Sequence, residues 1–202
     1  MSKVFGIGFH KTGTSTLHSM LKTLGYKVCP PNKGYRHIKF WHSGDYGPII
    51  KLASKYNGFQ DSPWCHPDMY KVLERAFPES KFILTIREPE DWFVSFYKNY
   101  SRLCHPTGKF NYKKYAKWDG RMYYDKIFGF IPNHYDDLLK NKYDIINVYS
   151  GYNESVKNYF SKDKLLVINW QAGDGWRDIC IFLNKDIITG PIPWVKKSKG
   201  LK

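Results

Sequence analysis

Basic, hydroxyl and glycine residues are concentrated in one short segment near the N-terminus, VFGIGFHKTGTST at residues 4–16. An apolar run leads into it and a helical pattern follows, so we expect a strand, a turn and a helix. Backbone N–H groups at a helix start point toward an anion, and the helix dipole favours negative charge there. Lys11 adds a positive charge beside Gly13, and further donors are the hydroxyls of Thr12, Thr14, Ser15 and Thr16. The segment predicts a phosphate site, with a tight turn that binds no ligand as the structural alternative.

The position of the lysine separates this segment from the loop of nucleoside-triphosphate enzymes. In that loop the lysine directly follows the last glycine. Here Gly13 is followed by Thr14, and Lys11 comes two residues before Gly13. A nucleoside or nucleotide kinase would also need a strand-end aspartate for Mg²⁺, for which the sequence has no clear candidate. A kinase is therefore the less favoured enzyme class.

A second segment, ILTIREPEDWFVSFY at residues 83–97, places an arginine where a strand should end. A guanidinium at a strand end can bind a phosphate with two hydrogen bonds. Ser95 lies eight residues after Arg87, in the helix predicted to start near Pro89, and its hydroxyl would complete the site. In the structural alternative, Arg87 pairs with a nearby acid and Ser95 is an ordinary helix residue.

Together the two segments resemble the family of sulfotransferases that use 3′-phosphoadenosine-5′-phosphosulfate (PAPS). The 5′-phosphosulfate loop of that family reads like Lys-Ser/Thr-Gly-Thr-Ser/Thr, which residues 11–15 match. Its 3′-phosphate motif is Arg-x-Pro with a serine eight residues after the arginine, which Arg87, Pro89 and Ser95 match. Gly175-Trp176 and the proline-rich residues 191–193 look like the late part of a bacterial-type branch.

The resemblance touches residues 4–25, 59–100 and 164–195. It implies an α/β fold like that of P-loop NTPases, in which a central parallel sheet is flanked by helices in three layers. It also implies transfer of a sulfuryl group from PAPS to a hydroxyl or amine acceptor, release of 3′,5′-adenosine bisphosphate (PAP), and no metal. The residues that would bind the cofactor are Lys11, Thr12, Gly13, Thr14, Ser15, Thr16, Arg87 and Ser95.

The resemblance implies catalytic roles for three residues. Lys11 would stabilise the charge that develops on the leaving phosphate. The acceptor hydroxyl must lose a proton, so a positioned base is expected. Several branches of the family carry a carboxylate or histidine after the third strand, where this chain has Gln60, Asp61 and His66. Asp61 is the predicted base and His66 or another histidine the alternative, while an Asp61 that only caps a turn is the structural alternative.

The chain departs from the family pattern at two loop positions. His10 stands before the lysine, where proline or arginine is common, and Thr16 stands where tryptophan is frequent. The aromatic neighbour of the adenine is therefore unassigned. Aromatic residues that would either line an acceptor pocket or pack in the core are Trp41, Trp64, Trp92, Trp118, Tyr123 and Tyr124, of which we assign Trp92 to the core.

Charge and composition limit the partners. The chain has 202 residues, 32 basic and 18 acidic, with a net charge of +14 that attracts polyanions. A basic nucleic-acid-binding module is the non-enzymatic alternative, because tyrosines and lysines alternate at residues 110–126. That alternative does not explain why Lys11 and Arg87 lie at predicted strand ends. We therefore expect a small-molecule or glycan acceptor and no nucleic acid, and the oligomeric state stays open.

The spacing of cysteine, histidine and apolar residues argues against metal-binding, disulfide-rich and membrane-spanning proteins. Cys29, Cys65, Cys104 and Cys180 form no CxxC pair, and the histidines form no HExxH pair, so neither a metal nor a disulfide framework is expected. No apolar run approaches the roughly 18–20 residues that span a bilayer. The N-terminus does not read as a signal peptide, so a cytoplasmic protein is the expectation.

The elements that must position these residues alternate between strands and helices. Strands are predicted at residues 4–9, 26–29, 57–60, 81–86 and 164–169, and helices at 14–24, 46–56, 67–77, from 88 onward and at 174–183. We expect a single domain over residues 1–202, with a helical and loop-rich acceptor-side region at about 105–160. Such alternation predicts a parallel sheet covered on both faces, with its ligand at the carboxyl ends of the strands.

Overall fold

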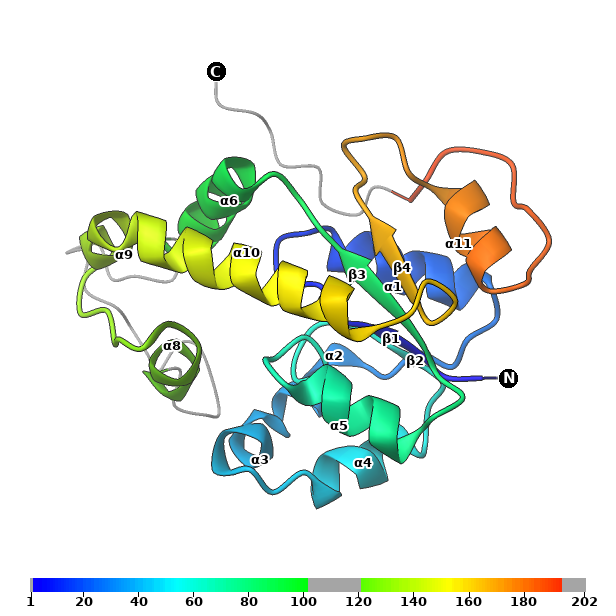
Figure 1. Ribbon diagram of the computed structural model, residues 1–202, viewed down its shortest axis with the longest axis horizontal. Helices are drawn as coiled ribbons and strands as arrows, with labels where there is room; N and C mark the ends of the chain where they lie inside the picture. Colours follow the sequence, from blue (N-terminus) through cyan, green and yellow to red (C-terminus); the bar gives the residue numbers. More distant parts are fainter. Residues whose placement is uncertain (1, 102–120, 194–202) are drawn as a thin grey trace.

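Four strands form one parallel sheet in a computed structural model that describes residues 2–101 and 121–193 (Figure 1). They are β1 (Val4–Gly6), β2 (Gly58–Phe59), β3 (Lys81–Thr85) and β4 (Leu165–Ile168). Their order is β2-β1-β3-β4, and Phe5 of β1 is paired with Phe59 on one side and Phe82 on the other. The carboxyl ends of all four strands therefore lie at the same edge of the sheet.

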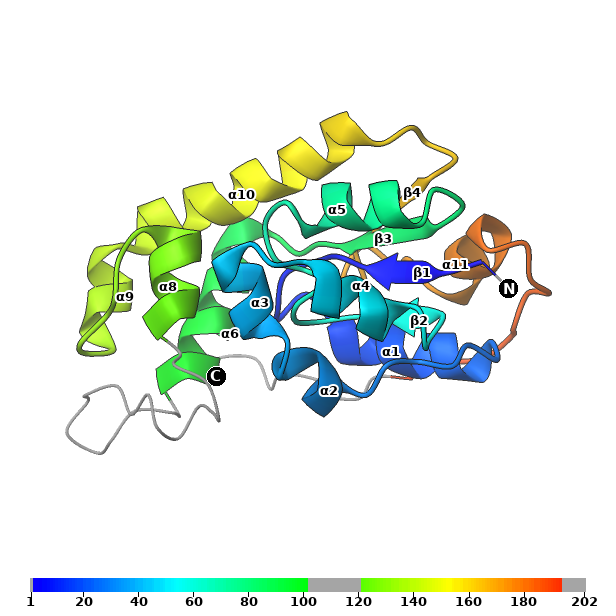
Figure 2. The same ribbon diagram turned by 90° about the horizontal axis from the view of Figure 1, so that it is seen from below.

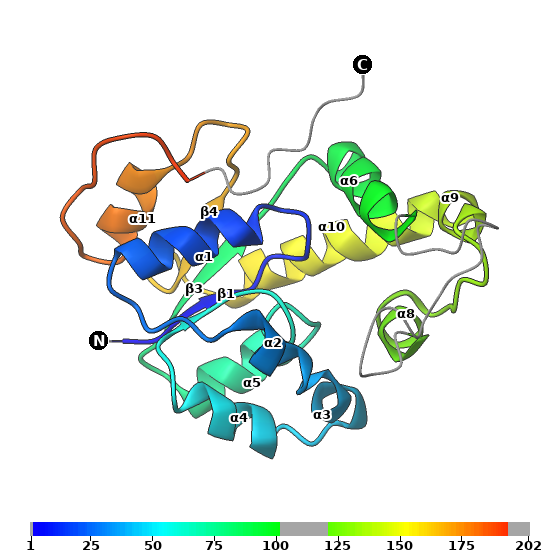
Figure 3. The same cartoon turned by 180° about the vertical axis from the view of Figure 1, so that it is seen from behind.

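Helices cover both faces of the sheet. They are α1 (Thr14–Thr23), α2 (Pro31–Tyr35), α3 (Ile38–Ser43), α4 (Gly47–Ala53), α5 (Met69–Ala76), α6 (Pro89–Ser101), α8 (Arg121–Phe128), α9 (Asp136–Lys140), α10 (Lys142–Tyr159) and α11 (Trp176–Phe182). Figure 2 shows α5 and α10 on one face and α1 on the other, and Figure 3 shows α1 and α11 lying over the same face.

Alternation along the strands gives each face its own core. Phe5 and Phe82 pack with residues of α5, α6 and α10 in one cluster, whereas Val4 and Ile83 pack with residues of α1 and α11 in a second. Successive strand side chains point to opposite faces, so buried strands of this kind are apolar throughout. The predicted α/β fold, with a central parallel sheet between layers of helices, is confirmed.

The first strand ends earlier than its apolar sequence predicts. Ile7 still donates its N–H to the carbonyl of Ile83 at 2.9 Å, but residues 7–9 are no longer strand. Gly8 passes so close to β3 that a Cβ there would lie 2.2 Å from Thr85 Oγ1. The chain therefore turns away from the sheet across the end of β3, which brings His10 and Lys11 over the strand ends.

The structure differs from the sequence predictions at two further places. Residues 26–29 form no strand and keep only an isolated parallel bridge between Val28 and Gly58, since Pro30 and Pro31 redirect the chain into α2. The short helices α2 and α3 were not predicted, because they have too few turns to show a clear apolar period. Cys104, Trp118 and most of the segment at 110–126 lie outside the described residues.

Candidate functional site

The loop before α1 has the backbone shape of an anion site. Lys11 and Gly13 both have positive φ, 73° and 90°, and Gly13 is the N-cap residue of α1. A Cβ on Gly13 would lie 2.4 Å from Trp170 Nε1, so both its conformation and its contact favour glycine. The first N–H groups of a helix have no partner within the helix. The loop therefore offers backbone donors at the carboxyl end of β1.

The side chains of this loop differ in what they contact. Thr12 is buried, and its hydroxyl contacts the carbonyl of Phe9 at 2.6 Å and Thr85 Oγ1 at 2.7 Å. Its hydroxyl thus holds the loop against the end of β3. Lys11 Nζ donates toward Asn99 Oδ1 of α6 over 3.5 Å, so its ammonium lies between the loop and α6.

Arg87 lies two residues beyond β3, at the adjacent strand end. Its N–H donates to the hydroxyl of Tyr149 at 2.9 Å, and the same hydroxyl donates to its carbonyl at 2.9 Å. The Nε of its guanidinium is buried without a hydrogen-bond partner among the described residues. Because an unpaired buried donor is costly, this Nε–H fits a site whose missing partner is an anion. Ser95 lies half-buried in α6, the helix that follows.

One pair of rings connects the two loops. Trp92 of α6 donates its indole N–H to the carbonyl of His10 at 2.9 Å. The same ring stacks on Tyr149 of α10, with centroids 4.1 Å apart and an interplanar angle of 6°. Since Tyr149 also holds the backbone of Arg87, the loop after β1 and the turn after β3 have a common support.

A second polar group surrounds His10 and the segment that follows β2. His10 Nε2 lies 2.6 Å from Asp61 Oδ1, and both side chains are largely buried. Asp61 Oδ1 also accepts the N–H of Ser62 at 2.9 Å, and Oδ2 accepts the hydroxyl of Tyr35 at 2.9 Å. Both carboxylate oxygens of Asp61 are thus engaged by donors.

These contacts change the acidity of both partners. Burial by itself would raise the pKa of Asp61, but the charge and hydrogen bond of His10 lower it to about 2. Burial by itself would lower the pKa of His10, yet the carboxylate of Asp61, followed by Cys65, raises it well above its usual range. The pair is therefore an imidazolium and a carboxylate around neutral pH.

Ser62 connects His10 to a second histidine. Its hydroxyl lies 2.8 Å from His10 Nε2 and 2.9 Å from His66 Nε2. His66 is 1% exposed, and its Nδ1 has no hydrogen-bond partner among the described residues. Burial, and next the charge of His10, lower the pKa of His66 well below its usual range. His66 is therefore a neutral imidazole whose Nε2 is hydrogen-bonded to the Ser62 hydroxyl.

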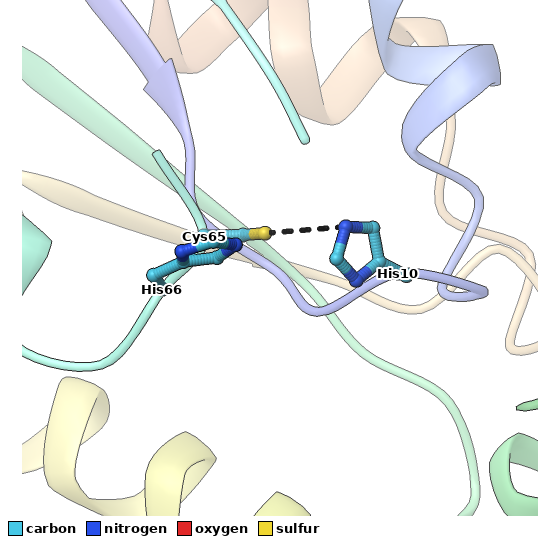
Figure 4. A group of neighbouring side chains, drawn as sticks. All are labelled: His10, Cys65 and His66. Atoms are coloured by element: carbon cyan, nitrogen blue, oxygen red, sulfur yellow. Dashed lines mark hydrogen bonds between the residues drawn. The ribbon is translucent and has the colours of Figure 1, made fainter. Parts of the chain in front are cut away.

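Figure 4 shows His10, Cys65 and His66 as neighbours, with Cys65 Sγ 3.9 Å from His10 Nε2. One potential ligand atom from each of the three lies within 4.8 Å of the others, and these residue types bind zinc in proteins. However, the Ser62 hydroxyl already contacts Nε2 of both imidazoles. We therefore interpret the group as a hydrogen-bonded cluster, and the absence of a metal stays a prediction.

Comparison with known proteins shows the family to which the chain belongs. The profile of a family described as "Sulfotransferase domain" matches residues 3–201. The chain is also 23% identical, over 217 positions, to "Ava biosynthesis cluster protein M" of Aspergillus versicolor, a match that covers 98% of this chain and 82% of the relative. The chain belongs to the sulfotransferase domain family. Membership supports a transferase with a sulfotransfer-type function.

In this member of the family the residues named from the sequence follow three neighbouring strands. The loop of residues 11–16 follows β1, Arg87 follows β3, and Asp61 follows β2. His66 lies further along, behind Ser62. Their roles stay predictions. Gln60, at the position where some branches have a carboxylate, is buried, and its Nε2 contacts His18 Nδ1 of α1 at 3.4 Å.

The sequence interpretation missed how closely His10 is tied to Asp61, Ser62 and Tyr123 in this candidate site. Its position before the lysine was noted only as a departure from the family pattern, which was the one available signal. Tyr35 and Tyr123 gave no signal, because their contacts with Asp61 and His10 join residues 26 and 113 positions apart. The rings of Trp41, Trp64, Trp92, Tyr123 and Tyr124 are all buried, which confirms Trp92 as a core residue. Within residues 2–101 and 121–193, the helices are too short or too polar to cross a membrane.

Proposed function

We propose that the protein transfers a sulfuryl group from PAPS to a hydroxyl or amine acceptor and releases PAP. The observation that carries this proposal is the Nε–H of Arg87, which is buried without a hydrogen-bond partner among the described residues, beside the anion-type loop of residues 11–16. Two donor groups at adjacent strand ends suit a ligand with anionic groups at two places. PAPS is such a ligand, with a 5′-phosphosulfate and a 3′-phosphate, and family membership supports it as the donor.

The proposed roles divide between the two strand ends. Backbone N–H groups at the start of α1, with the hydroxyls of Thr14, Ser15 and Thr16, bind the 5′-phosphosulfate. Thr12 contributes mainly by holding the loop, because its hydroxyl is already engaged. Lys11 exchanges its contact with Asn99 for one with the donor, and its ammonium stabilises the negative charge that develops on the leaving phosphate. Arg87 and Ser95 bind the 3′-phosphate.

Asp61 and His66 are the bases proposed from the sequence for the acceptor's proton. Their local contacts differ, because Asp61 already receives several donors whereas His66 is buried and neutral. We further propose a single domain over residues 1–202 in a cytoplasmic protein. The name of the Aspergillus versicolor relative refers to a biosynthesis cluster, which favours a small molecule over a glycan as the acceptor.

Nucleotide binding tests this function directly. Isothermal titration calorimetry should detect PAP binding in the presence of EDTA, and much weaker binding of 5′-AMP, which lacks the 3′-phosphate. A preference for ATP with Mg²⁺ would instead indicate a kinase. Binding of single-stranded RNA without any preference for PAP would indicate a nucleic-acid-binding module.

A further inference from the structure

The two nitrogens of the His10 imidazole have different partners. Nε2 lies 2.6 Å from Asp61 Oδ1, and Nδ1 lies 3.1 Å from the hydroxyl of Tyr123. Since a carboxylate only accepts hydrogen bonds, the proton that His10 keeps when neutral is at Nε2. The lone pair of neutral His10 is then at Nδ1 and faces a hydroxyl. A carboxylate that orients an imidazole toward a hydroxyl is the arrangement that lets an imidazole take a proton.

Asp61 and His66 are less suited to take the proton. The oxygens of Asp61 receive donors from His10, Ser62 and Tyr35, and a carboxyl with a pKa of about 2 is a weak base. His66 is 1% exposed and lies behind the Ser62 hydroxyl. An acceptor would have to displace internal hydrogen bonds to reach Asp61, and to reach His66 it would have to enter a buried position.

We infer that Nδ1 of His10 takes the proton of the acceptor hydroxyl, and that Asp61 is the positioning residue that fixes the imidazole. This inference rests on the function proposed above. His10 directly precedes Lys11, and its carbonyl is held by the indole of Trp92, so its imidazole adjoins the loop proposed for the phosphosulfate. The hydroxyl of Tyr123 marks the place beside Nδ1 that the acceptor hydroxyl takes in the reaction.

The bonds balance without a further reactant. The acceptor O–H bond breaks, its proton goes to His10 Nδ1, and the electron pair on the oxygen forms the new bond to sulfur. The bond between sulfur and the bridging phosphate oxygen breaks, and its electron pair leaves with PAP. The imidazolium then releases its proton to solvent.

The rate should depend on the charge state of His10. Groups that face it are Asp61, Cys65 and His66 from the segment between β2 and α5 and Tyr123 from α8, while Lys11, the next residue in its loop, is directed toward Asn99. Protonated His10 cannot accept a proton, so turnover should rise with pH as the imidazolium is deprotonated. Asp61→Asn removes the charge that favours the imidazolium, so the midpoint of this rise should move to lower pH. A role confined to packing would leave the midpoint unchanged.

His10→Gln is the central variant, because an amide N–H can still reach Asp61 but offers no base. Turnover of PAPS is measured with water, phenol and 4-nitrophenol as acceptors, and PAP binding by calorimetry. With phenol, turnover should fall by about 10²–10⁴-fold. The loss should be much smaller with 4-nitrophenol, which ionises near neutral pH, and PAP binding should weaken far less than turnover. His37→Gln makes the same chemical change away from this cluster and is the matched control.

Three results separate the inference from the function on which it rests. If His10→Gln, or His10→Asn should the first variant not fold, loses turnover equally with all three acceptors or keeps it, His10 is not the base. Activity restored to His10→Ala by added imidazole would support the inference. A wild-type protein that neither binds PAP nor turns over PAPS would overturn the proposed function itself.

Discussion

The loop before α1 and the cluster around His10 are neighbours built in opposite ways. The loop is a local structure, because a strand end, a glycine with positive φ and a helix start within residues 6–14 define its shape. The cluster joins α2, the turn after β2, the loop after β1 and α8, and side chains make nearly all of its contacts. An anion site can thus be recognised from consecutive residues, whereas a proton-transfer site depends on the whole fold.

Among changes in the loop, the largest effect is expected for its lysine. Lys11→Ala should lower turnover with PAPS by about 10²–10³-fold, because an electrostatic contact to the leaving group contributes roughly 3–4 kcal/mol to the barrier. PAP binding should fall less. Lys51→Ala, which removes an exposed lysine from α4, is the control for net charge. If both variants were equally active, Lys11 would have no specific role.

A substitution at Gly13 tests whether the shape of the loop depends on this glycine. Gly13→Ala should lower the free energy of unfolding by about 2–5 kcal/mol, since positive φ costs an L-residue roughly 1–2 kcal/mol and overpacking adds about 1–3. The new Cβ would meet Trp170 Nε1 at 2.4 Å. Gly25→Ala is a matched control, with φ of 82° and open space around it. Urea denaturation should show a clearly larger loss for Gly13→Ala, and equal losses would mean that Trp170 simply moves away.

A substitution of Arg87 tests the ligand site at the end of β3, which is held by the same Trp92–Tyr149 pair as the loop. Arg87→Ala should weaken PAP at least tenfold, because a charge-assisted hydrogen bond contributes about 1.5–3 kcal/mol. Binding of 5′-AMP should change little, since it has no 3′-phosphate. Arg75→Ala, at an exposed position of α5, provides the control in the same calorimetric titration. Equal weakening of PAP and 5′-AMP would assign Arg87 a general rather than a 3′-specific role.

The smallest expected effect concerns the cluster and pH. The lowered pKa of Asp61 contributes stability above its unfolded value near 4, and that stability is lost as pH falls toward 2. The raised pKa of His10 contributes stability below its unfolded value near 6.5, and that stability is lost as pH rises through the folded value. The two contributions overlap between about pH 4 and 6.5.

A double-mutant cycle of His10→Gln and Asp61→Asn isolates this ion pair from His66, whose lowered pKa acts in the opposite direction. Urea denaturation should give a larger coupling energy at about pH 5.5 than at about pH 9.5. A coupling that does not change with pH would mean that the pair is not an ion pair in the folded protein.

The fold was largely readable from the sequence, because its signals are local. The runs KFILTI and KLLVIN predicted β3 and β4 within a residue or two, and the leucines after Thr14 predicted α1. Residues 26–29 have the composition of a strand, yet they make only one bridge. Their pairing is decided by the path of the chain through Pro30 and Pro31, which short-range patterns do not contain.

Only the part of the candidate site whose position is set by the backbone could be predicted from the sequence. Lys11, Gly13 and Arg87 were found because the chain itself fixes their positions at strand ends. Asp61 and His66 were named for their chemistry, but which groups occupy their oxygens and nitrogens depends on Tyr35, Ser62 and His10. Such contacts determine whether a residue is a base or the partner of one, and they form only when distant segments pack.

The stacked rings of Trp92 and Tyr149 fix the distance between the loop after β1 and the turn after β3, because each ring holds the backbone of one of them. Under the proposed function, the loop after β1 binds the 5′-phosphosulfate of the donor and the turn after β3 binds its 3′-phosphate. The two rings would therefore set the distance between the anionic groups that a ligand must have. A smaller residue at either position would loosen both ends together. Discrimination against nucleotides with one phosphate would then decline before the overall fold did, through two side chains that need never contact the ligand.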